Sequence, residues 1–202
     1  MPTYTSQPDE TNGIDTYIKT DAPSTNYAIN PYLVIGEWNG GSSNNHTLIK
    51  FDLSTIPSSA KIISATFYLT YSGTEYSSNS RTVQAYRLKR NWVENQATWN
   101  VYSTGNSWQT AGGTGADDIE ASTIGTYSIT ATPSGVYSMN LDVALVEEWV
   151  KGTFTNNGIL LKTDADTDDQ VYYHSSSAET STNRPKLVIE YNLGSHQVII
   201  MA

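Results

Sequence analysis

The stretch NWVENQATWN, residues 91–100, carries residue types that can do chemistry on a sugar. Trp92 and Trp99 bracket Glu94; indole faces stack on sugar rings, and a carboxylate can bond hydroxyls or act as a general acid. Glycoside hydrolysis canonically needs two carboxylates at a defined separation, and the sequence identifies no partner for Glu94. We therefore favour a structural interpretation, in which the tryptophans close one end of the fold and Glu94 bonds backbone amides of the loop.

Aromatic residues in loops are further candidates for binding a ligand. Trp38 in EWNGG and Trp108 in NSWQT stand among Gly, Asn and Ser, where a rigid ring is suited to stacking on a ligand. Tyr32, Tyr76 and Tyr102 are weaker companions. These five residues form the predicted glycan-binding set, with packing in the core as the competing interpretation for Trp108.

The segment TDADTDDQ, residues 163–170, is the strongest candidate for a metal site. Asp164, Asp166 and Asp168 alternate and are followed by Asp169, a pattern of oxygen ligands similar to the first half of a calcium loop. The glycine turn and the bidentate glutamate of an EF-hand are missing. We favour a solvated hairpin turn and keep a calcium site as the alternative; no other cofactor is indicated.

The elements that must position these residues are strands. The chain has 202 residues, enough for one sizeable core, and only 15% of them are charged. Ser, Thr, Asn, Gly and Tyr are abundant, which favours short strands joined by polar turns. Strands are expected at 15–19, 30–36, 46–54, 61–73, 82–90, 158–163, 170–176 and 184–191.

The segment 56–73 has the clearest alternation, with Ile63, Ala65, Phe67 and Leu69 on one face. The segment NLDVALVEEWVKG, residues 140–152, is the one with helical periodicity. Asp142 is a suitable N-cap for it and Gly152 a suitable C-cap. The chain is therefore expected to be all-β, with one short helix near 142–151.

The net charge of the chain limits the classes of partner that it is expected to bind. With 20 acidic and 11 basic residues, the net charge of −9 repels phosphate backbones and anionic membranes, whereas neutral glycans remain open. No segment approaches the ~20 apolar residues that a membrane span needs. The chain contains no cysteine, which excludes disulfides and a cysteine nucleophile. Nucleic-acid binding and membrane insertion are therefore not expected.

The two ends of the chain differ from its centre. Residues 1–13 are polar with two prolines, indicating an arm, and they lack the basic start and apolar run of a secretory signal. Residues 193–202 include an apolar run, Val198, Ile199, Ile200 and Met201, that would be a sticky strand if left exposed. We expect this run to make assembly contacts, either with its own sheet or with a neighbouring chain.

Several sequence blocks occur in an order that resembles a known family. They include DTYI, YLVIG, LIKFDLSTIP, AKIISATFYL, NWVENQATWN, DVALVEEWVKG, NNGILLK and RPKLVIEY. Over residues 15–192 the chain resembles the DNRLRE domain family, which overlaps a family of carbohydrate-binding modules. The resemblance implies a jelly-roll-like antiparallel β-sandwich for residues 14–192, a non-catalytic role, and occurrence in extracellular proteins and in phage structural proteins.

Two functions follow from these observations. The favoured one is a non-catalytic display protein on the surface of a larger assembly such as a phage capsid, a decoration or fibre-like protein. It would contact itself or other capsid or surface proteins through its termini, and any glycan through its loops. The alternative is a stand-alone extracellular glycan-binding module. An enzyme is a distant third, and the expected location is the virion surface or the extracellular space.

Overall fold

The computed structural model describes residues 1–38, 42–76, 80–164 and 169–193, except for the side chains of residues 74–76. The described chain is dominated by antiparallel strands, with one short α-helix, α1 (Val143–Lys151), and a single turn of 3-10 helix, η1 (Ser181–Asn183). The all-β class expected from the sequence is therefore confirmed.

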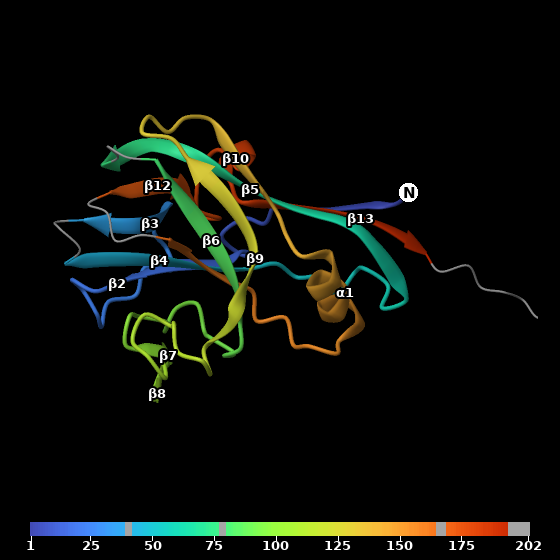
Figure 1. Ribbon diagram of the computed structural model, residues 1–202, viewed down its shortest axis with the longest axis horizontal. Coiled ribbons are helices and arrows are strands. Elements are labelled where there is room, and N and C mark those ends of the chain that lie inside the picture. The colour runs from blue at the N-terminus through green and yellow to red at the C-terminus, as the bar shows by residue number, and fades with distance from the viewer. Residues whose placement is uncertain (39–41, 77–79, 165–168, 194–202) are drawn as a thin grey trace, which may run out of the picture.

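Four strands form the first layer, here called sheet A. They follow the order β1 (Thr3–Ser6), β13 (Lys186–Leu193), β5 (Ala60–Tyr76) and β10 (Val136–Asn140). In Figure 1, β1, β13 and the start of β5 project together as a ribbon, with the N-terminus at its tip. The arm expected at residues 1–13 thus contains a strand, because β13 offers it a partner that local sequence does not reveal.

Seven strands form the second layer, sheet B. They are β2 (Ile14–Lys19), β3 (Tyr32–Trp38), β4 (Ser43–Lys50), β6 (Arg81–Leu88), β9 (Ile119–Ile129), β11 (Ile159–Thr163) and β12 (Gln170–His174). The pairing runs β12-β3-β4-β11-β6-β9, and β2 joins β4. A separate small hairpin pairs β7 (Val101–Ser103) with β8 (Asn106–Ser107).

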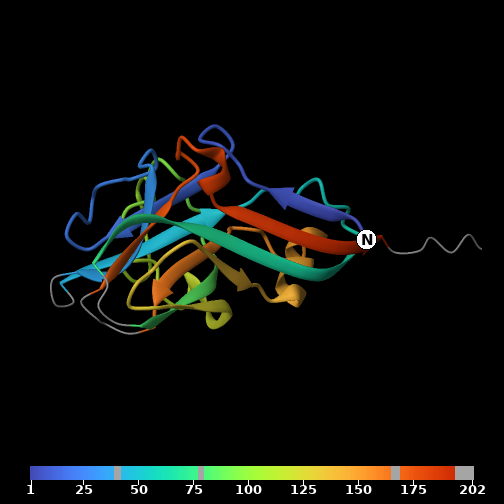
Figure 2. The ribbon, with the colours of Figure 1, turned by 90° about the horizontal axis from the view of Figure 1, so that it is seen from above.

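The long strand β5 belongs to both layers. Its first part pairs with β13 and β10, and its end pairs with β12. The view from above shows it running along most of the molecule as one curved band (Figure 2). The main core lies between the layers and includes Phe67, Leu69, Ile35 and Tyr173, each at most 1% exposed.

A bulge in β5 changes which isoleucine enters this core. Glu190 of β13 pairs with Ser64, but Tyr191 pairs with Ile62, so Ile63 is an extra residue. Ile62 is 2% exposed and Ile63 is 42% exposed. The expectation that Ile63 faces the core was therefore wrong, because one inserted residue reverses the alternation of a strand.

At the far edge of sheet B, β9 approaches β10 of sheet A and nearly closes the two layers. A Cβ at Gly125 of β9 would lie 2.7 Å from the Met139 side chain and 2.8 Å from the carbonyl oxygen of Asn140. Only glycine allows two backbones to approach so closely.

Helix α1 packs beside β5, and its ends match the sequence expectation. The Asp142 carboxylate accepts hydrogen bonds from the N–H groups of Ala144 at 2.9 Å and Leu145 at 3.4 Å. Gly152 ends the helix with a left-handed φ of 77°. Val146, Trp149 and Val150 are buried against the main core. No helix in the described part of the chain is long and apolar enough to cross a membrane.

Candidate functional site

The stretch NWVENQATWN lies in a second, smaller core on the outer face of sheet B. The indole N–H of Trp92 donates to the carbonyl of Asn157 at 2.8 Å, and that of Trp108 donates to the carbonyl of Thr98 at 2.9 Å. Residues 89–118 thereby fold over apolar side chains of β2, β4, β6 and β11, forming what we call the lid. The core residues of this cluster are Ile18, Leu48, Leu88, Trp92, Ala97, Trp108, Ile119 and Leu160.

Two members of the predicted glycan-binding set, Trp108 and Tyr102, belong to the lid, and the structure contradicts the prediction for Trp108. Trp108 is only 4% exposed, so it cannot stack on a ligand. Tyr102 is half-buried, with its ring centroid 5.5 Å from that of Trp108 and the Arg90 guanidinium 5.5 Å above it. Both residues pack on the apolar outer surface of sheet B, whose exposure to water would be costly.

A buried carboxylate anchors the end of the lid. Asp118 accepts hydrogen bonds from the N–H groups of Gln109, Thr110 and Gly115 at 3.0–3.1 Å, and from Arg90 Nε at 3.2 Å. Burial opposes ionisation of this carboxyl, but the donated bonds outweigh it and lower its pKa. These hydrogen bonds between residues of the lid therefore hold its backbone in place.

Glu94 has a carboxyl neighbour that the sequence does not reveal. Its Oε1 accepts the backbone N–H of Asp15 at 2.9 Å, and the Asp15 carboxyl accepts the N–H of Ser176 at 2.9 Å and its hydroxyl at 3.0 Å. Burial, together with the charge of Glu94, raises the pKa of Asp15 to about 7, and burial raises that of Glu94. Asp15 is 1% exposed, so this pair joins β2, the lid and the loop after β12 rather than facing a substrate.

The remaining predicted aromatic residues are not brought together with the lid. Tyr32 lies on β3 and is 37% exposed, and Trp38 ends the same strand, half-buried and paired with Ser43. Tyr76 is the last residue of β5, and its side chain lies outside the described part. The predicted set is therefore not gathered in one place, and among its four members with described side chains Tyr32 is the one classed as exposed.

The aspartates of the calcium candidate have other partners where they are described. Asp164 is exposed and its carboxylate accepts the N–H of Thr82 at 3.0 Å. Asp169 is fully buried and forms an ion pair with Arg81 at 2.6 Å, which also donates to the Asp169 carbonyl. Asp166 and Asp168 lie outside the described residues, as do Val198, Ile199, Ile200 and Met201 of the tail. Among the described residues, no group of three or more His, Asp or Glu side chains is placed to hold a metal ion.

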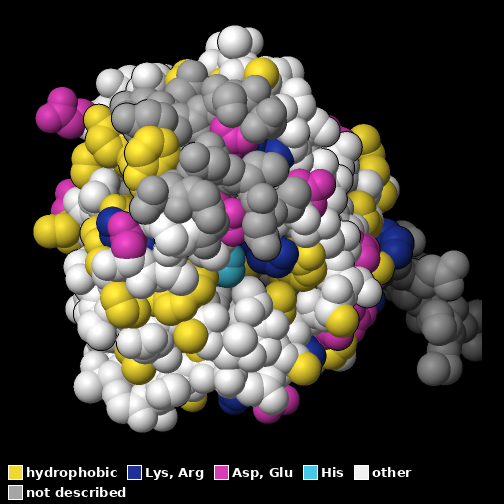
Figure 3. Space-filling view, turned by 60° about the vertical axis from the view of Figure 1, so that its left-hand side comes forward, with side chains coloured by type: hydrophobic (Ala, Val, Ile, Leu, Met, Phe, Trp, Pro, Cys, Tyr) yellow, Lys and Arg dark blue, Asp and Glu magenta, His cyan; other side chains and the backbone are white. Residues whose placement is uncertain are grey.

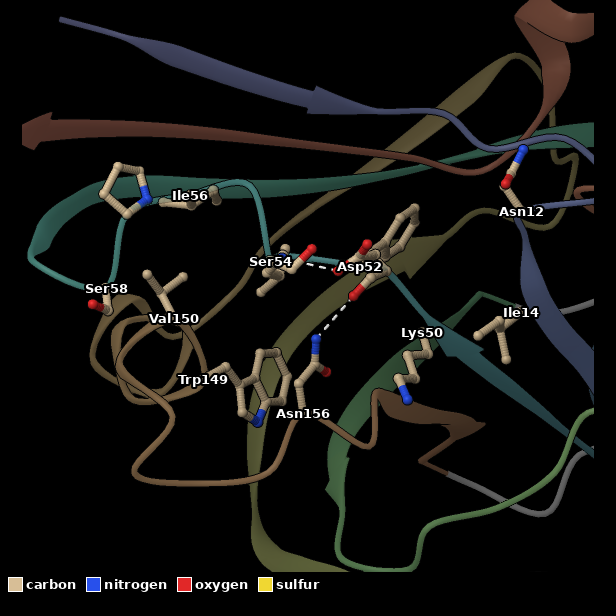
Figure 4. Close-up of a pocket in the computed structure, with 13 residues that line it drawn as sticks. Asn12, Ile14, Lys50, Asp52, Ser54, Ile56, Ser58, Trp149, Val150 and Asn156 are labelled. Carbon is tan, nitrogen blue, oxygen red and sulfur yellow. Dashed lines mark hydrogen bonds between the residues drawn. The ribbon is translucent and has the colours of Figure 1, made fainter.

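A cavity beside α1 is a candidate binding site formed by described residues (Figure 4). It has a volume of about 710 Å³, within the ~300–1,000 Å³ range of small-molecule sites. We call it the α1 cavity. Its walls come from the loop before β2, the β4–β5 connection, the end of α1 and the segment before β11. The lining residues are Asn12, Ile14, Lys50, Phe51, Asp52, Leu53, Ser54, Ile56, Pro57, Ser58, Trp149, Val150 and Asn156.

Hydrogen bonds hold the polar rim of the α1 cavity in place. The Asp52 carboxylate accepts the N–H of Ser54 at 2.9 Å, and Asn156 Nδ2 donates to the carbonyl of Phe51 at 2.8 Å (Figure 4). The hydroxyl of Tyr4 on β1 donates to the backbone carbonyl of Asp52. The bond from Ser54 is the main cause of the lowered pKa of Asp52, and the charge of Lys50 adds to it. Asp52 is therefore an ionised hydrogen-bond acceptor at neutral pH.

None of these lining residues was predicted from the sequence to bind a ligand. They come from segments between residues 12 and 156, and each has an ordinary local explanation. Asp52 and Ser54 form a turn after a strand, and Trp149 continues the apolar stripe of a helix. No local signal could have found the cavity, because it exists only where these segments meet.

The comparison with protein families adds one finding. A family model described as the disaggregatase related repeat domain matches residues 15–189, from β2 into β13. This is not the DNRLRE family that the sequence blocks resemble, so that resemblance is confirmed only as far as a β-rich domain. No curated protein matches the chain significantly.

Proposed function

The chain belongs to the disaggregatase related repeat domain family, and from this premise we propose that it is a non-catalytic module that binds a neutral saccharide in the α1 cavity. The observation that carries the proposal is the composition of the cavity wall. The amides of Asn12 and Asn156 and the hydroxyls of Ser54 and Ser58 stand over an apolar floor, to which the largely buried Trp149, Val150 and Ile56 contribute only their edges. Sugars need this combination of apolar surface and directed hydrogen bonds.

The charges of the cavity and of the chain favour a neutral ligand. The lining contains one cationic side chain, Lys50, and one anionic side chain, Asp52. The chain as a whole carries −9, which repels an anionic polymer. A carboxylate and an ammonium group can both bond sugar hydroxyls without requiring a charged ligand.

The same geometry supports a binding role rather than hydrolysis. Canonical glycosidases place two carboxylates on opposite sides of the scissile bond, and one of them must hold a proton. Asp52 is the single carboxylate in the lining, and its lowered pKa keeps it ionised. Asp15 and Glu94 have raised pKa values, but neither lines the α1 cavity.

A blocking substitution tests the proposal. Ser58 and Ser59 are neighbouring exposed residues of the turn closed by the hydrogen bond from Ala60 N–H to Pro57 O, but only Ser58 lines the cavity. We expect Ser58→Trp to weaken binding at least tenfold on an array of neutral oligosaccharides, with affinities measured by calorimetry. Ser59→Trp is the matched control and should bind like the wild type. Absence of wild-type binding to every glycan, or equal loss in both variants, refutes the proposal.

A second proposal places the module on a larger assembly such as a phage capsid. The observation that favours it is that both described ends of the chain lie together. Tyr191 N–H donates to the carbonyl of Pro2, and Thr3 pairs with Glu190. One end of the molecule can therefore serve as the attachment while the rest is displayed (Figure 1). Deletion of residues 194–202 should abolish incorporation into particles; normal incorporation of the shortened chain contradicts the proposal.

A further inference from the structure

A group of aromatic rings lies on the outer face of β3 and β12 and shares no residue with the α1 cavity. Tyr32 pairs with His174 across the two strands, and their ring centroids are 6.1 Å apart. Tyr172 lies on the same face, with its ring nearly perpendicular to that of Tyr32 at 6.3 Å. The alternate residue Tyr173 is fully buried in the main core. Strand alternation therefore directs these three rings outward.

The loop between β2 and β3 adds a further ring to this face. Tyr27 stacks on Tyr17 of β2, with centroids 4.2 Å apart and planes inclined by 20°. Burial is the main cause of the raised pKa of Tyr17, and the phenols of Tyr27 and Tyr172 add to it, so these groups lie near one another. We call Tyr27, Tyr32, Tyr172 and His174 the aromatic platform.

The platform is held rigid by the lid. Asn26, which precedes Tyr27, donates from Nδ2 to the carbonyls of Glu94 at 2.6 Å and Ala97 at 2.7 Å. The hydroxyl of Ser175, which follows His174, donates to the carbonyl of Asn30 at 2.7 Å. Rings fixed before a ligand arrives lose little entropy on binding, which favours affinity.

These rings remain partly exposed to solvent, which packing between the two strands does not by itself explain. Tyr32 is 37% exposed, Tyr27, Tyr172 and His174 are half-buried, and the neighbouring Ile29 is 81% exposed. On the side of the molecule that Figure 3 shows, hydrophobic side chains lie in several patches among polar and charged ones. Separate rings with polar edges suit a hydroxyl-rich ligand better than the broad apolar surface of a protein partner.

We propose that the aromatic platform is a second glycan-binding surface, which stacks the pyranose rings of an extended polysaccharide chain. The hydroxyls of Tyr27 and Tyr32 can bond sugar hydroxyls at the ring edges, whereas the Tyr172 hydroxyl already accepts from Gln170 Nε2 at 3.2 Å and His174 Nε2 lies 3.4 Å from Asn183 Nδ2. The proposal does not depend on the α1 cavity, since the two sets share no residue. An open platform gains contacts as a chain lengthens, whereas a closed site is filled by a short oligosaccharide.

The test uses the whole chain and two kinds of probe. The probes are insoluble cellulose and chitin in pull-down assays, and soluble xylan and mannan in affinity electrophoresis, each compared with its oligosaccharides. We expect the double variant Tyr32→Ala/His174→Ala to bind at least one polysaccharide tenfold more weakly. The matched control is Tyr68→Ala, because Tyr68 is also a half-buried outward tyrosine, on β5 of sheet A beside Lys186.

The outcomes separate the two sites. Loss of polysaccharide binding in the double variant, with Tyr68→Ala unchanged, supports the platform. Wild-type binding to none of the four polysaccharides, or undiminished binding by the double variant, overturns it. The single variant Tyr32→Phe keeps the ring and is expected to retain most binding; a loss equal to that of the double variant would contradict stacking. Ser58→Trp changes the α1 cavity alone, so each proposal can still be tested if the other is refuted.

Discussion

The buried carboxyl of Asp15 makes folding stability depend on pH in a way that can be worked out in advance. The carboxyl is 1% exposed, and its side-chain hydrogen bonds come from Ser176. Burial raises its pKa from 3.8 to about 7. Because the folded value exceeds the unfolded one, the folded chain holds this proton more tightly.

The sign and the size of the effect follow from these two values. Below pH 3.8 both states are protonated, and the stabilisation is fully present. As the pH rises towards 7, the unfolded chain releases its proton and the folded chain keeps it, so stability falls; above about 7 the loss is complete. The difference between the two pKa values corresponds to a loss of about 4 kcal/mol in the free energy of unfolding.

Asp15→Asn isolates this contribution. The amide oxygen can accept the Ser176 N–H, and the amide nitrogen can donate to the Ser176 hydroxyl, so both hydrogen bonds persist without a titratable group. We expect the free energy of unfolding of the variant, relative to the wild type, to rise by about 2–4 kcal/mol between pH 4 and pH 8. Urea unfolding followed by tryptophan fluorescence measures it.

The matched control for this prediction is Glu179→Gln, since Glu179 is an exposed carboxyl. Its difference from the wild type should stay within about 0.5 kcal/mol at both pH values. A difference between Asp15→Asn and the wild type that does not change with pH, or that falls as the pH rises, would refute the reasoning.

Further predictions concern the ion pair, the lid and the calcium candidate. Asp169→Asn should destabilise the fold by about 3–5 kcal/mol, because the Arg81 guanidinium, whose side chain is 1% exposed, would then face a neutral group. Urea titration measures the free energy of unfolding, and a loss under about 1 kcal/mol contradicts this prediction. Trp92→Ala should lower the free energy of unfolding by about 3–5 kcal/mol, because it leaves a cavity in the second core and removes the hydrogen bond to Asn157. Unchanged stability would show that packing of the lid does not stabilise the fold. Removal of calcium by EDTA should leave the melting temperature measured by calorimetry unchanged, because Asp169 is already paired with Arg81. A fall of several degrees that added calcium reverses would instead show a calcium site.

Local sequence signals determined the fold class and several elements. Alternation in 61–73 and, less cleanly, in 82–90 predicted β5 and β6, because a strand with one buried face repeats every second residue. The stripe of Val143, Val146, Trp149 and Val150 predicted α1, and Asp142 and Gly152 marked its ends through backbone chemistry that acts within a few residues. Two strands, β9 and β10, gave no such signal, since buried and exposed residues do not alternate regularly along most of their length.

Tertiary structure decided what depends on segments that are far apart in the chain. It paired β1 with β13, turned Ile62 instead of Ile63 into the core, and buried Trp108 under the lid. The neighbour of Glu94 is Asp15, 79 positions away, so counting carboxylates near Glu94 could not find it. Composition and spacing state which side chains are available to bind a sugar. Which of them share a surface, and which are withdrawn from water, depends on strand pairing and burial over the whole molecule.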